Sequence, residues 1–251
     1  MAYRAELLAA GLFPLLYWQG KRTRANTLRL PEAAGLPYGL AGVTGQDQAD
    51  SLKLLVIGES PVAGVGVATY QDSLAAQFAQ VLAIQTGRAV HWRAIGKNGS
   101  KLADFLENER SFLPELHMRP DLVLLAFGVN DTTGFTSDAR YYAGLQGLKD
   151  LLERRCNPTC WLISAVPQVG RFPALPQPLR TVLGYKAQAL NRVTEDFAAR
   201  NGIRFVTMPE LRQAWMASDG FHPSASGIRA WVQLLSEAYL SQKSCGFPQS
   251  G

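Results

Sequence analysis

The sequence contains few of the residues that bind metals or build disulfide frameworks. Its 251 residues include three cysteines and three histidines, and the cysteines form neither a metal-binding pattern nor a disulfide framework. Cys156 and Cys160 flank the segment N-P-T and could pair if oxidised, although reduced thiols are the usual state in cytoplasmic proteins. We therefore expect no bound metal, and the sequence leaves the pairing of these two cysteines open.

The apolar segment near the N-terminus is too short to cross a membrane. Residues Leu7 to Trp18 read L-L-A-A-G-L-F-P-L-L-Y-W, whereas a transmembrane helix needs about 20 apolar residues. A basic stretch, Q-G-K-R-T-R, follows in place of the small-residue cleavage site of a signal peptide. We expect this segment to pack on the folded domain, with contact to a membrane surface as the alternative. The protein is accordingly expected in the cytoplasm, with peripheral membrane association left open.

Charged residues are also scarce. They make up 18% of the chain against 47% for hydrophobic residues, which is typical of a folded globular protein. The net charge is +5, and basic residues crowd the first thirty positions: Arg4, Lys21, Arg22, Arg24 and Arg29. This basic segment is either a solvated arm or attracted to an anionic membrane surface. No basic helix or aromatic–basic pattern follows, so we expect no nucleic-acid partner.

The chain divides into one main domain and two flanking parts. Residues 1–50 are expected to form an arm that ends in the polar stretch T-G-Q-D-Q-A-D-S, which is typical of a loop. Residues 51–242 show a regular alternation of apolar runs and amphipathic segments, and residues 243–251 form a short tail. The length of the central part suits a single domain.

The central part alternates predicted strands with predicted helices. The strands are expected at 54–57, 91–95, 121–127, 161–166 and 204–206, and the helices at 71–86, 100–115, 137–155, 179–201 and 224–241. Strands that are apolar along their length and alternate with helices indicate a parallel sheet covered on both faces. The sequence therefore predicts an α/β fold.

Five polar or small residues follow the ends of these strands. Ser60 comes after the first strand, Gly99 after the second and Asn130 after the third, while Asp219 and His222 come after the fifth. Ligands of open α/β sheets bind beyond the carboxyl ends of the strands. We therefore expect all five residues at one edge of the sheet.

The residue types at this edge suit a serine hydrolase. Ser60 would be the nucleophile, which needs a base within hydrogen-bond reach. His222 would be that base, because imidazole titrates near neutral pH, and Asp219, three residues upstream, could orient its ring. The backbone N–H of Ser60, Gly99 and the Asn130 side chain could donate to an oxyanion. Taken singly, each residue could equally serve only in a turn or a helix entry.

Four segments together resemble the SGNH hydrolases, also called the GDSL esterase/lipase family. They are G-E-S-P at Ser60, I-G-K-N-G-S at Gly99, G-V-N-D at Asn130 and D-G-F-H-P-S at His222, and the resemblance covers residues 51–242. It implies the catalytic and oxyanion roles given above and the use of no metal or organic cofactor. It also implies a flavodoxin-like three-layer α/β/α sandwich with a five-stranded parallel sheet in the order 2-1-3-4-5. Two residues depart from the family pattern, since Glu59 stands where Asp is usual and Pro61 where Leu is common.

The sequence thus predicts a serine carboxylic ester hydrolase that works through an acyl-enzyme on short to medium acyl or aryl esters. The loops after the third and fourth strands are expected to contact the substrate, through Phe135, Val169, Arg171, Phe172 and Leu175. A lysophospholipase, a thioesterase and a carbohydrate deacetylase remain open within this class. Two alternatives from other classes are a catalytically silent binding module with the same fold and a membrane-docked interaction protein built on the arm.

Overall fold

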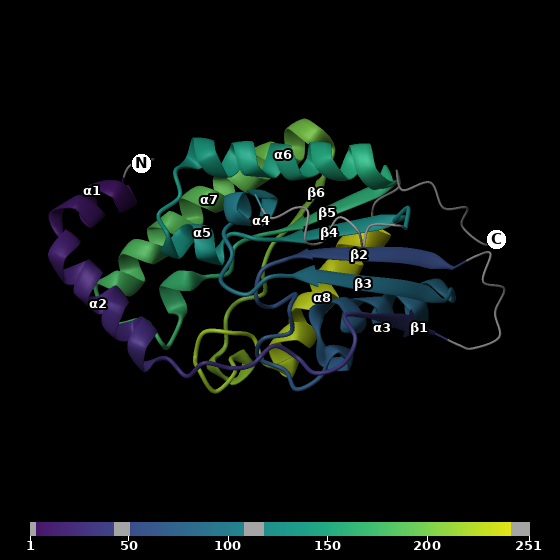
Figure 1. Cartoon of the computed structure of the whole chain (residues 1–251), viewed down its shortest axis with the longest axis horizontal. Helices are drawn as coiled ribbons and strands as arrows, with labels where there is room; N and C mark the ends of the chain where they lie inside the picture. The colour runs from purple at the N-terminus through teal and green to yellow at the C-terminus, as the bar shows by residue number, and fades with distance from the viewer. Residues whose placement is uncertain (1–3, 43–50, 108–117, 242–251) are drawn as a thin grey trace.

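The protein is built around one twisted, mixed six-stranded sheet (Figure 1). The computed structural model describes residues 4–42, 51–107 and 118–241. The sheet has the order β1-β3-β2-β4-β5-β6. Its strands are β1 (Tyr38–Ala41), β2 (Leu52–Gly58), β3 (Val90–Gly96), β4 (Leu122–Ala126), β5 (Cys160–Ser164) and β6 (Arg204–Val206).

The prediction of a five-stranded parallel sheet in the order 2-1-3-4-5 is wrong for the sheet as a whole. A sixth strand, β1, comes from the N-terminal segment and pairs antiparallel with β3, with Tyr38 opposite Arg93 and Ala41 opposite Val90. The remaining strands are all parallel to their neighbours. Taken alone in chain order, β2 to β6 lie in the arrangement 2-1-3-4-5. The added strand covers an edge that a purely parallel sheet would have left open.

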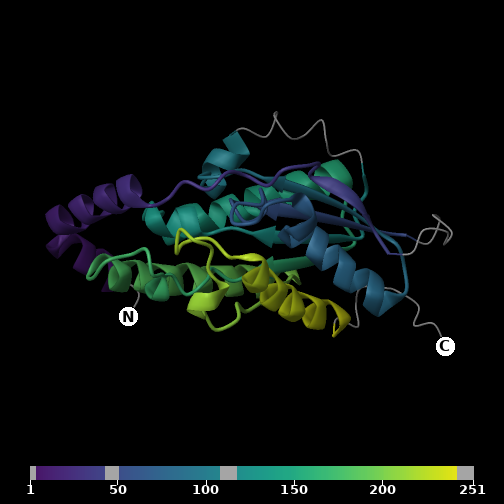
Figure 2. The ribbon, with the colours of Figure 1, turned by 90° about the horizontal axis from the view of Figure 1, so that it is seen from below.

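Helices cover both faces of the sheet, which makes three layers (Figures 1 and 2). On one face lie α3 (Leu74–Thr86) and α8 (Ala225–Leu240). On the other lie α4 (Leu102–Glu107), α6 (Asp138–Cys156) and α7 (Leu179–Asn201). The predicted helix at 100–115 is described only as far as Glu107, because residues 108–117 lie outside the described part.

The core is divided between the two faces by the alternation of the strands. Successive side chains of a strand point to opposite faces, and in β2 Leu54 and Val56 pack with α3 and α8. Leu55 and Ile57 pack in the cluster that includes α6 and α7. All four are at most 1% exposed, which explains why β2 is apolar from Leu54 to Ile57.

Side-chain caps fix the starts of three helices. The hydroxyls of Ser73, Ser137 and Ser224 accept hydrogen bonds from backbone N–H groups in the first turns of α3, α6 and α8. Such caps satisfy donors that have no partner within the helix. The cap at Ser224, two residues after His222, also fixes where α8 begins.

The N-terminal hairpin, residues 4–26, consists of α1 (Arg4–Gly11) and α2 (Phe13–Asn26). It packs against α7, and Ala5 and Leu16 are buried in that contact region. Residues 4–42 therefore fold onto the domain through both the hairpin and β1. The predicted domain boundary at residue 50 and the tail at 243–251 lie outside the described residues. Of the helices in the described ranges, none is both long and apolar enough to pass through a membrane.

The pairing of Cys156 with Cys160, which the sequence left open, does not form. Cys156 is a buried free thiol at the end of α6, and its Sγ–H donates to the Leu152 carbonyl at 3.2 Å. Burial raises the pKa of this thiol to about 11. The thiol therefore acts as a small apolar side chain in the core.

Candidate functional site

Ser60 lies in a tight turn directly after β2. The carbonyl of Glu59 accepts hydrogen bonds from the N–H groups of Val62 and Ala63, at 3.0 and 3.2 Å, and the Ser60 carbonyl accepts from Val65 at 2.9 Å. These bonds coil the chain into a helical turn immediately beyond the sheet. The turn places the Ser60 side chain at the carboxyl edge of the parallel strands, where the sequence predicted it.

His222 and Asp219 lie together in the loop that precedes α8. The Asp219 Oδ1 accepts hydrogen bonds from the backbone N–H groups of Phe221, at 2.9 Å, and His222, at 3.0 Å. The Met216–Pro223 bridge closes the loop. The aspartate therefore shapes the turn with one oxygen, and its other oxygen is available to the His222 ring.

The three residues form a continuous hydrogen-bonded line. The Asp219 Oδ2 lies 2.5 Å from His222 Nδ1, and His222 Nε2 lies 2.9 Å from Ser60 Oγ. Because a carboxylate can only accept, Nδ1 carries a proton, and Nε2 of the neutral ring is left as the acceptor for the serine hydroxyl. The Asp219 side chain is fully buried and that of His222 is 16% exposed. Burial raises the pKa of Asp219, but the hydrogen bonds from His222 and Phe221 outweigh it, so the pKa lies below its ordinary value.

A glycine lets the serine turn and the histidine loop approach each other. Gly66 has a φ of +105°, and a Cβ at this position would lie 2.3 Å from the Pro223 carbonyl oxygen and 3.2 Å from the His222 Cβ. Any larger residue would clash with backbone there. Two segments that are far apart in the sequence are thus held at the distance that the Ser60–His222 hydrogen bond requires.

Glu59 binds the start of the short helix α5 (Val129–Thr133). Its carboxyl group accepts hydrogen bonds from the N–H groups of Gly128 at 2.8 Å, Val129 at 3.2 Å and Asn130 at 3.3 Å. Burial raises the pKa of Glu59 to about 8 in spite of these three donors, and the nearby Asp131 adds to the increase. The glutamate that departs from the family pattern therefore connects the serine turn directly to the segment that carries Asn130.

Two of the candidate oxyanion donors, Gly99 and Asn130, are connected through Ser100. The Asn130 Nδ2 donates one hydrogen bond to the Ser100 carbonyl, at 3.1 Å, which leaves the second hydrogen of this amide for a ligand. Gly99, next to Ser100, lies in an exposed turn with a φ of +75°. Within the described part of the chain, the backbone N–H groups of Ser60 and Gly99 donate to no protein group.

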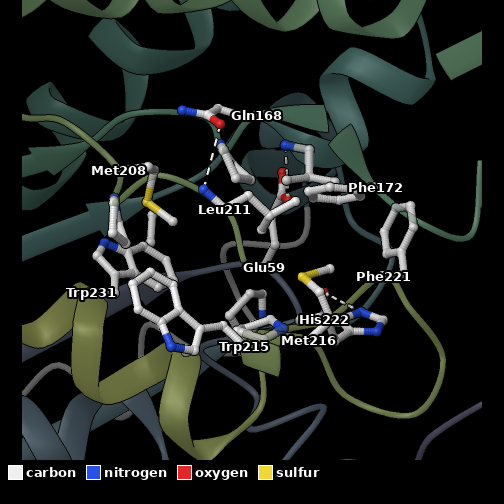
Figure 3. A pocket seen from close by; sticks show the side chains of 18 of the residues that line it. Glu59, Gln168, Phe172, Met208, Leu211, Trp215, Met216, Phe221, His222 and Trp231 are labelled. Carbon is white, nitrogen blue, oxygen red and sulfur yellow. Dashed lines mark hydrogen bonds between the residues drawn. The ribbon is translucent and has the colours of Figure 1, made fainter. Parts of the chain in front are cut away.

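An apolar pocket opens beside Ser60 and His222 (Figure 3). Figure 3 shows Trp215, Trp231 and Met208 at one side, and Phe172 and Phe221 toward His222. The main apolar side chains of the pocket come from three parts of the chain. Phe172 belongs to the loop after β5, and Phe221 and Trp231 belong to the histidine loop and α8. The segment after β6 contributes Met208, Pro209, Leu211, Trp215 and Met216. The pocket therefore offers an apolar site directly next to the serine hydroxyl.

Only Phe172 of the five predicted substrate contacts lines this pocket. Val169 and Leu175 are buried in the core cluster on the α7 side of the sheet, and Phe135 packs against the same cluster. Arg171 is exposed and forms an ion pair with Glu210 at 2.6 Å, which lowers the pKa of that glutamate. Substrate contact by these five residues stays a prediction, and the geometry favours Phe172, because Val169 and Leu175 of the same loop pack into the core.

The pocket residues that sequence analysis missed lie mainly at 208–216. This segment directly follows β6, so the rule that ligands bind beyond the carboxyl ends of parallel strands would have pointed to it. It reads M-P-E-L-R-Q-A-W-M, with four large apolar side chains that no predicted helix or strand accounts for. Trp231 carried no separate signal, since its spacing in α8 is that of a core residue.

Comparison with known protein families identifies the family of this chain. The GDSL-like lipase/acylhydrolase family matches residues 56–230, which include Ser60, Gly99, Asn130, Asp219 and His222. The chain belongs to this family. The predicted resemblance to the GDSL family is thereby confirmed, as is the predicted enzyme class, ester hydrolase, at the level of the family.

The chain is also similar to individual members of the GDSL family. It is 25% identical to a GDSL-like esterase of Mycobacterium tuberculosis over 197 residues, which cover 72% of this chain and 60% of that protein. The match thus spans about three fifths of the length of this relative. A lipase from a goat rumen metagenome has a TM-score of 0.62 at 14% identity, and covers 74% of this chain and 97% of its own. A carbohydrate acetylesterase family member of Sinorhizobium meliloti has a TM-score of 0.58 at 18% identity, with 78% and 100% covered. These two structures support the fold.

Proposed function

We propose that this GDSL family protein hydrolyses carboxylic esters through an acyl-enzyme formed on Ser60. The observation that carries the proposal is the hydrogen-bonded line from Asp219 through His222 to the Ser60 hydroxyl, with distances of 2.5 and 2.9 Å. A serine hydroxyl becomes a strong nucleophile only when a base can take its proton. Here the base is oriented and the acid that orients it is buried.

In the proposed first half-reaction, the Ser60 Oγ attacks the ester carbonyl carbon while His222 Nε2 takes its proton. The carbonyl oxygen becomes an oxyanion, which accepts hydrogen bonds from the N–H groups of Ser60 and Gly99 and from the Asn130 Nδ2. Each such donor is worth a factor of about 10² to 10³ in rate. Collapse of the intermediate breaks the bond to the alcohol, and the imidazolium returns the proton to that leaving group.

In the second half-reaction, water attacks the acyl-enzyme in the same way. His222 takes a proton from the water, and after collapse it returns that proton to Ser60 as the carboxylic acid leaves. The buried Asp219 carboxylate stabilises the imidazolium in both halves. No cofactor is needed for either step, in keeping with the resemblance to the SGNH hydrolases.

The pocket supports an apolar acyl or aryl group as the preferred part of the substrate. Its lining includes two tryptophans, three phenylalanines and two methionines, and such sites bind by removing apolar surface from water. We infer that esters of medium acyl chains react faster than acetate. Lipid-derived esters and thioesters belong to this class, whereas the walls offer little for the hydroxyl groups of a sugar.

The test is hydrolysis of p-nitrophenyl acetate, butyrate and octanoate by the full chain and by Ser60→Ala. We expect kcat/KM to rise with acyl length for the wild type, and the variant to lose activity by about 10⁴-fold or more. Ser226→Ala is the matched control, because within the described residues this nearby hydroxyl bonds to Ser224 and the Ala214 carbonyl and not to the three residues of the line. It should keep wild-type activity.

Covalent labelling provides a second measurement. A fluorophosphonate probe should attach to Ser60 in the wild type and in Ser226→Ala, as located by peptide mass spectrometry, and fail to attach in Ser60→Ala. Turnover that is equal in wild type and Ser60→Ala would instead support the silent binding module with the same fold.

A further inference from the structure

The N-terminal hairpin, residues 4–26, exposes a concentration of large apolar side chains. Twelve such side chains are exposed in the described part of the chain, and six of them lie within residues 7–18, with exposed fractions between 40% and 72%. The six are Leu7, Leu8, Phe13, Leu15, Tyr17 and Trp18. Scattered exposed apolar residues are normal, but a concentration of this size marks an interaction surface.

The exposed apolar residues of α2 lie opposite its buried side. Leu16 and Gln19 face the domain and are 6% and 8% exposed. Phe13 and Tyr17, one turn apart, stack with ring centroids 6.0 Å apart, and Trp18 is 54% exposed. The aromatic side chains of α2 therefore point into solvent, away from the rest of the protein.

Basic residues continue the same exposed face. Lys21 Nζ lies 5.5 Å from the centre of the Tyr17 ring, and the Arg22 guanidinium lies 5.2 Å from that of Trp18, each pair one turn apart. Residues 7–31 contain no acidic residue and four basic ones. The four are Lys21, Arg22, Arg24 and Arg29.

Buried polar contacts hold the hairpin in this orientation. The Gln19 side chain donates to the Gln177 carbonyl at 2.6 Å and accepts from the Leu179 N–H at 3.1 Å. Lys186 of α7, only 1% exposed, pairs with Glu6 of α1 at 3.0 Å. Turning the aromatic face inward would break these bonds and leave buried groups without partners.

The hairpin lies at the end of the molecule toward which the parallel strands run (Figures 1 and 2). This is the end that carries Ser60 and His222. Gln19 bonds to the last residues of the loop after β5, and Phe172 in the same loop lines the apolar pocket. A surface bound by the hairpin would therefore lie at the same end as the pocket.

We propose that the exposed face of the N-terminal hairpin docks on the surface of an anionic lipid bilayer. Tryptophan and tyrosine are enriched where a membrane meets water, and lysine and arginine next to them are attracted to anionic headgroups. The hairpin would lie in the plane of the interface with its apolar side chains among the upper parts of the acyl chains. An anionic bilayer fits this face better than a protein partner does, because residues 7–31 hold four basic residues and no acidic one, a charge balance that anionic headgroups attract.

The test is flotation of the full chain with vesicles of phosphatidylcholine, with and without phosphatidylglycerol. We expect the wild type to float with the anionic vesicles, less so at raised salt, and Ser60→Ala to bind equally, because docking does not depend on catalysis. Phe13→Ser/Trp18→Ser should abolish binding. Lys21→Ala/Arg22→Ala should weaken it about thirtyfold, since each basic residue near the surface adds about a factor of five.

Matched variants test whether position matters. Ile84→Ser/Leu240→Ser removes two other exposed apolar side chains, from α3 and α8, and Arg154→Ala/Arg155→Ala removes two exposed charges from the end of α6. Both should bind as the wild type does. Wild type that fails to float, or hairpin variants that bind like their controls, would overturn the proposal. Light scattering gives a further test. A wild type that is dimeric and a Phe13→Ser/Trp18→Ser variant that is monomeric would also overturn the proposal, because the exposed face would then bind a second copy of the chain.

Discussion

At the scale of single residues, the two oxygens of Asp219 have separate tasks. Oδ1 accepts from the backbone N–H groups of Phe221 and His222, and Oδ2 meets His222 Nδ1. In Asp219→Asn, the amide oxygen can keep the backbone bonds while the NH₂ group faces Nδ1. The imidazole is then pushed into the tautomer whose Nε2 carries the proton and cannot accept one from Ser60.

We therefore expect Asp219→Asn to keep its fold and lose kcat by about 10³- to 10⁴-fold. Hydrolysis of p-nitrophenyl butyrate measures the rate, and a thermal melt checks the fold. Asp196→Asn is the control, because this aspartate pairs with Arg200 on the exposed surface of α7. A kcat for Asp219→Asn within tenfold of the wild type would contradict the orienting role.

Glu59 gives the protein a pH-dependent stability of a particular sign. Its pKa is raised to about 8 by burial, so the folded protein holds a proton over a range in which the unfolded chain has lost it. Folding then takes up a proton, and the free energy of unfolding falls as the pH rises from about 5 to 8. Glu59→Gln removes this dependence, although its amide hydrogens cost stability against the three backbone donors at every pH.

The expected result is a change in slope. Between pH 5 and pH 8 the free energy of unfolding of the wild type should fall relative to that of Glu59→Gln by about 3 kcal/mol, as an order of magnitude. Urea unfolding at pH 5, 6.5 and 8 measures both proteins. If the backbone donors at the start of α5 instead kept Glu59 ionised, the free energy of unfolding of the wild type would not fall relative to that of the variant over this range. That result would refute the raised pKa.

At the scale of elements, α1 depends on one buried amine of α7. Lys186 pairs with Glu6 of α1 at 3.0 Å and with Asp138 of α6 at 2.9 Å. Both carboxylates are nearly half exposed, so they can be hydrated again when the amine is removed. The pairs therefore fix where α1 lies more than they stabilise the whole domain.

The substitution Lys186→Met keeps a long unbranched side chain at this position and removes its charge. We expect amide hydrogen exchange at residues 5–11 to speed up about fivefold to tenfold, with p-nitrophenyl acetate hydrolysis within about twofold of the wild type. Lys149→Met, which breaks an i,i+4 pair with Glu153 on α6, should leave exchange in α1 unchanged. Equal exchange in both variants would mean that α1 is held by its apolar contacts alone.

At the scale of the whole molecule, the parallel part of the fold could be predicted from the sequence. Each of the predicted strands at 54–57, 91–95 and 204–206 lies within an observed strand. The run at 54–57 is fully buried and apolar throughout, which is the pattern of a strand covered on both faces. The edge on which Ser60 and His222 meet followed from the direction of these strands. Local sequence and chain direction were enough for both.

The parts that could not be predicted depend on contacts between distant segments. The antiparallel strand β1 reads Y-G-L-A, which carries no period-2 pattern, and it becomes a strand only because β3 offers an open edge. The pocket combines Phe172, Leu211 and Trp231, which come from three separate segments. Nothing in the loop after β5 distinguishes Phe172, which lines the pocket, from Val169, which is in the core.

The assembly of the pocket from separate segments gives a prediction about selectivity. Leu211 stands near the middle of the view of the pocket in Figure 3 and is partly buried. In Leu211→Trp the indole takes up space that a long acyl chain would occupy, while an acetyl group needs only the region next to Ser60. We expect kcat/KM for p-nitrophenyl octanoate to fall about tenfold or more, with that for acetate within about threefold.

Ala214→Trp provides the matched control for this variant. It adds the same indole three residues away, at an exposed position that does not line the pocket, and should leave the ratio of octanoate to acetate unchanged. A Leu211→Trp enzyme with the wild-type ratio would place the acyl chain elsewhere, and the apolar walls would then have to bind the alcohol part of the ester. The two arrangements bury different ends of the substrate, so butyrate esters of a series of alcohols distinguish them. If the pocket binds the alcohol part, Leu211→Trp should slow the hydrolysis of esters of larger alcohols selectively. If it binds the acyl chain, it should not.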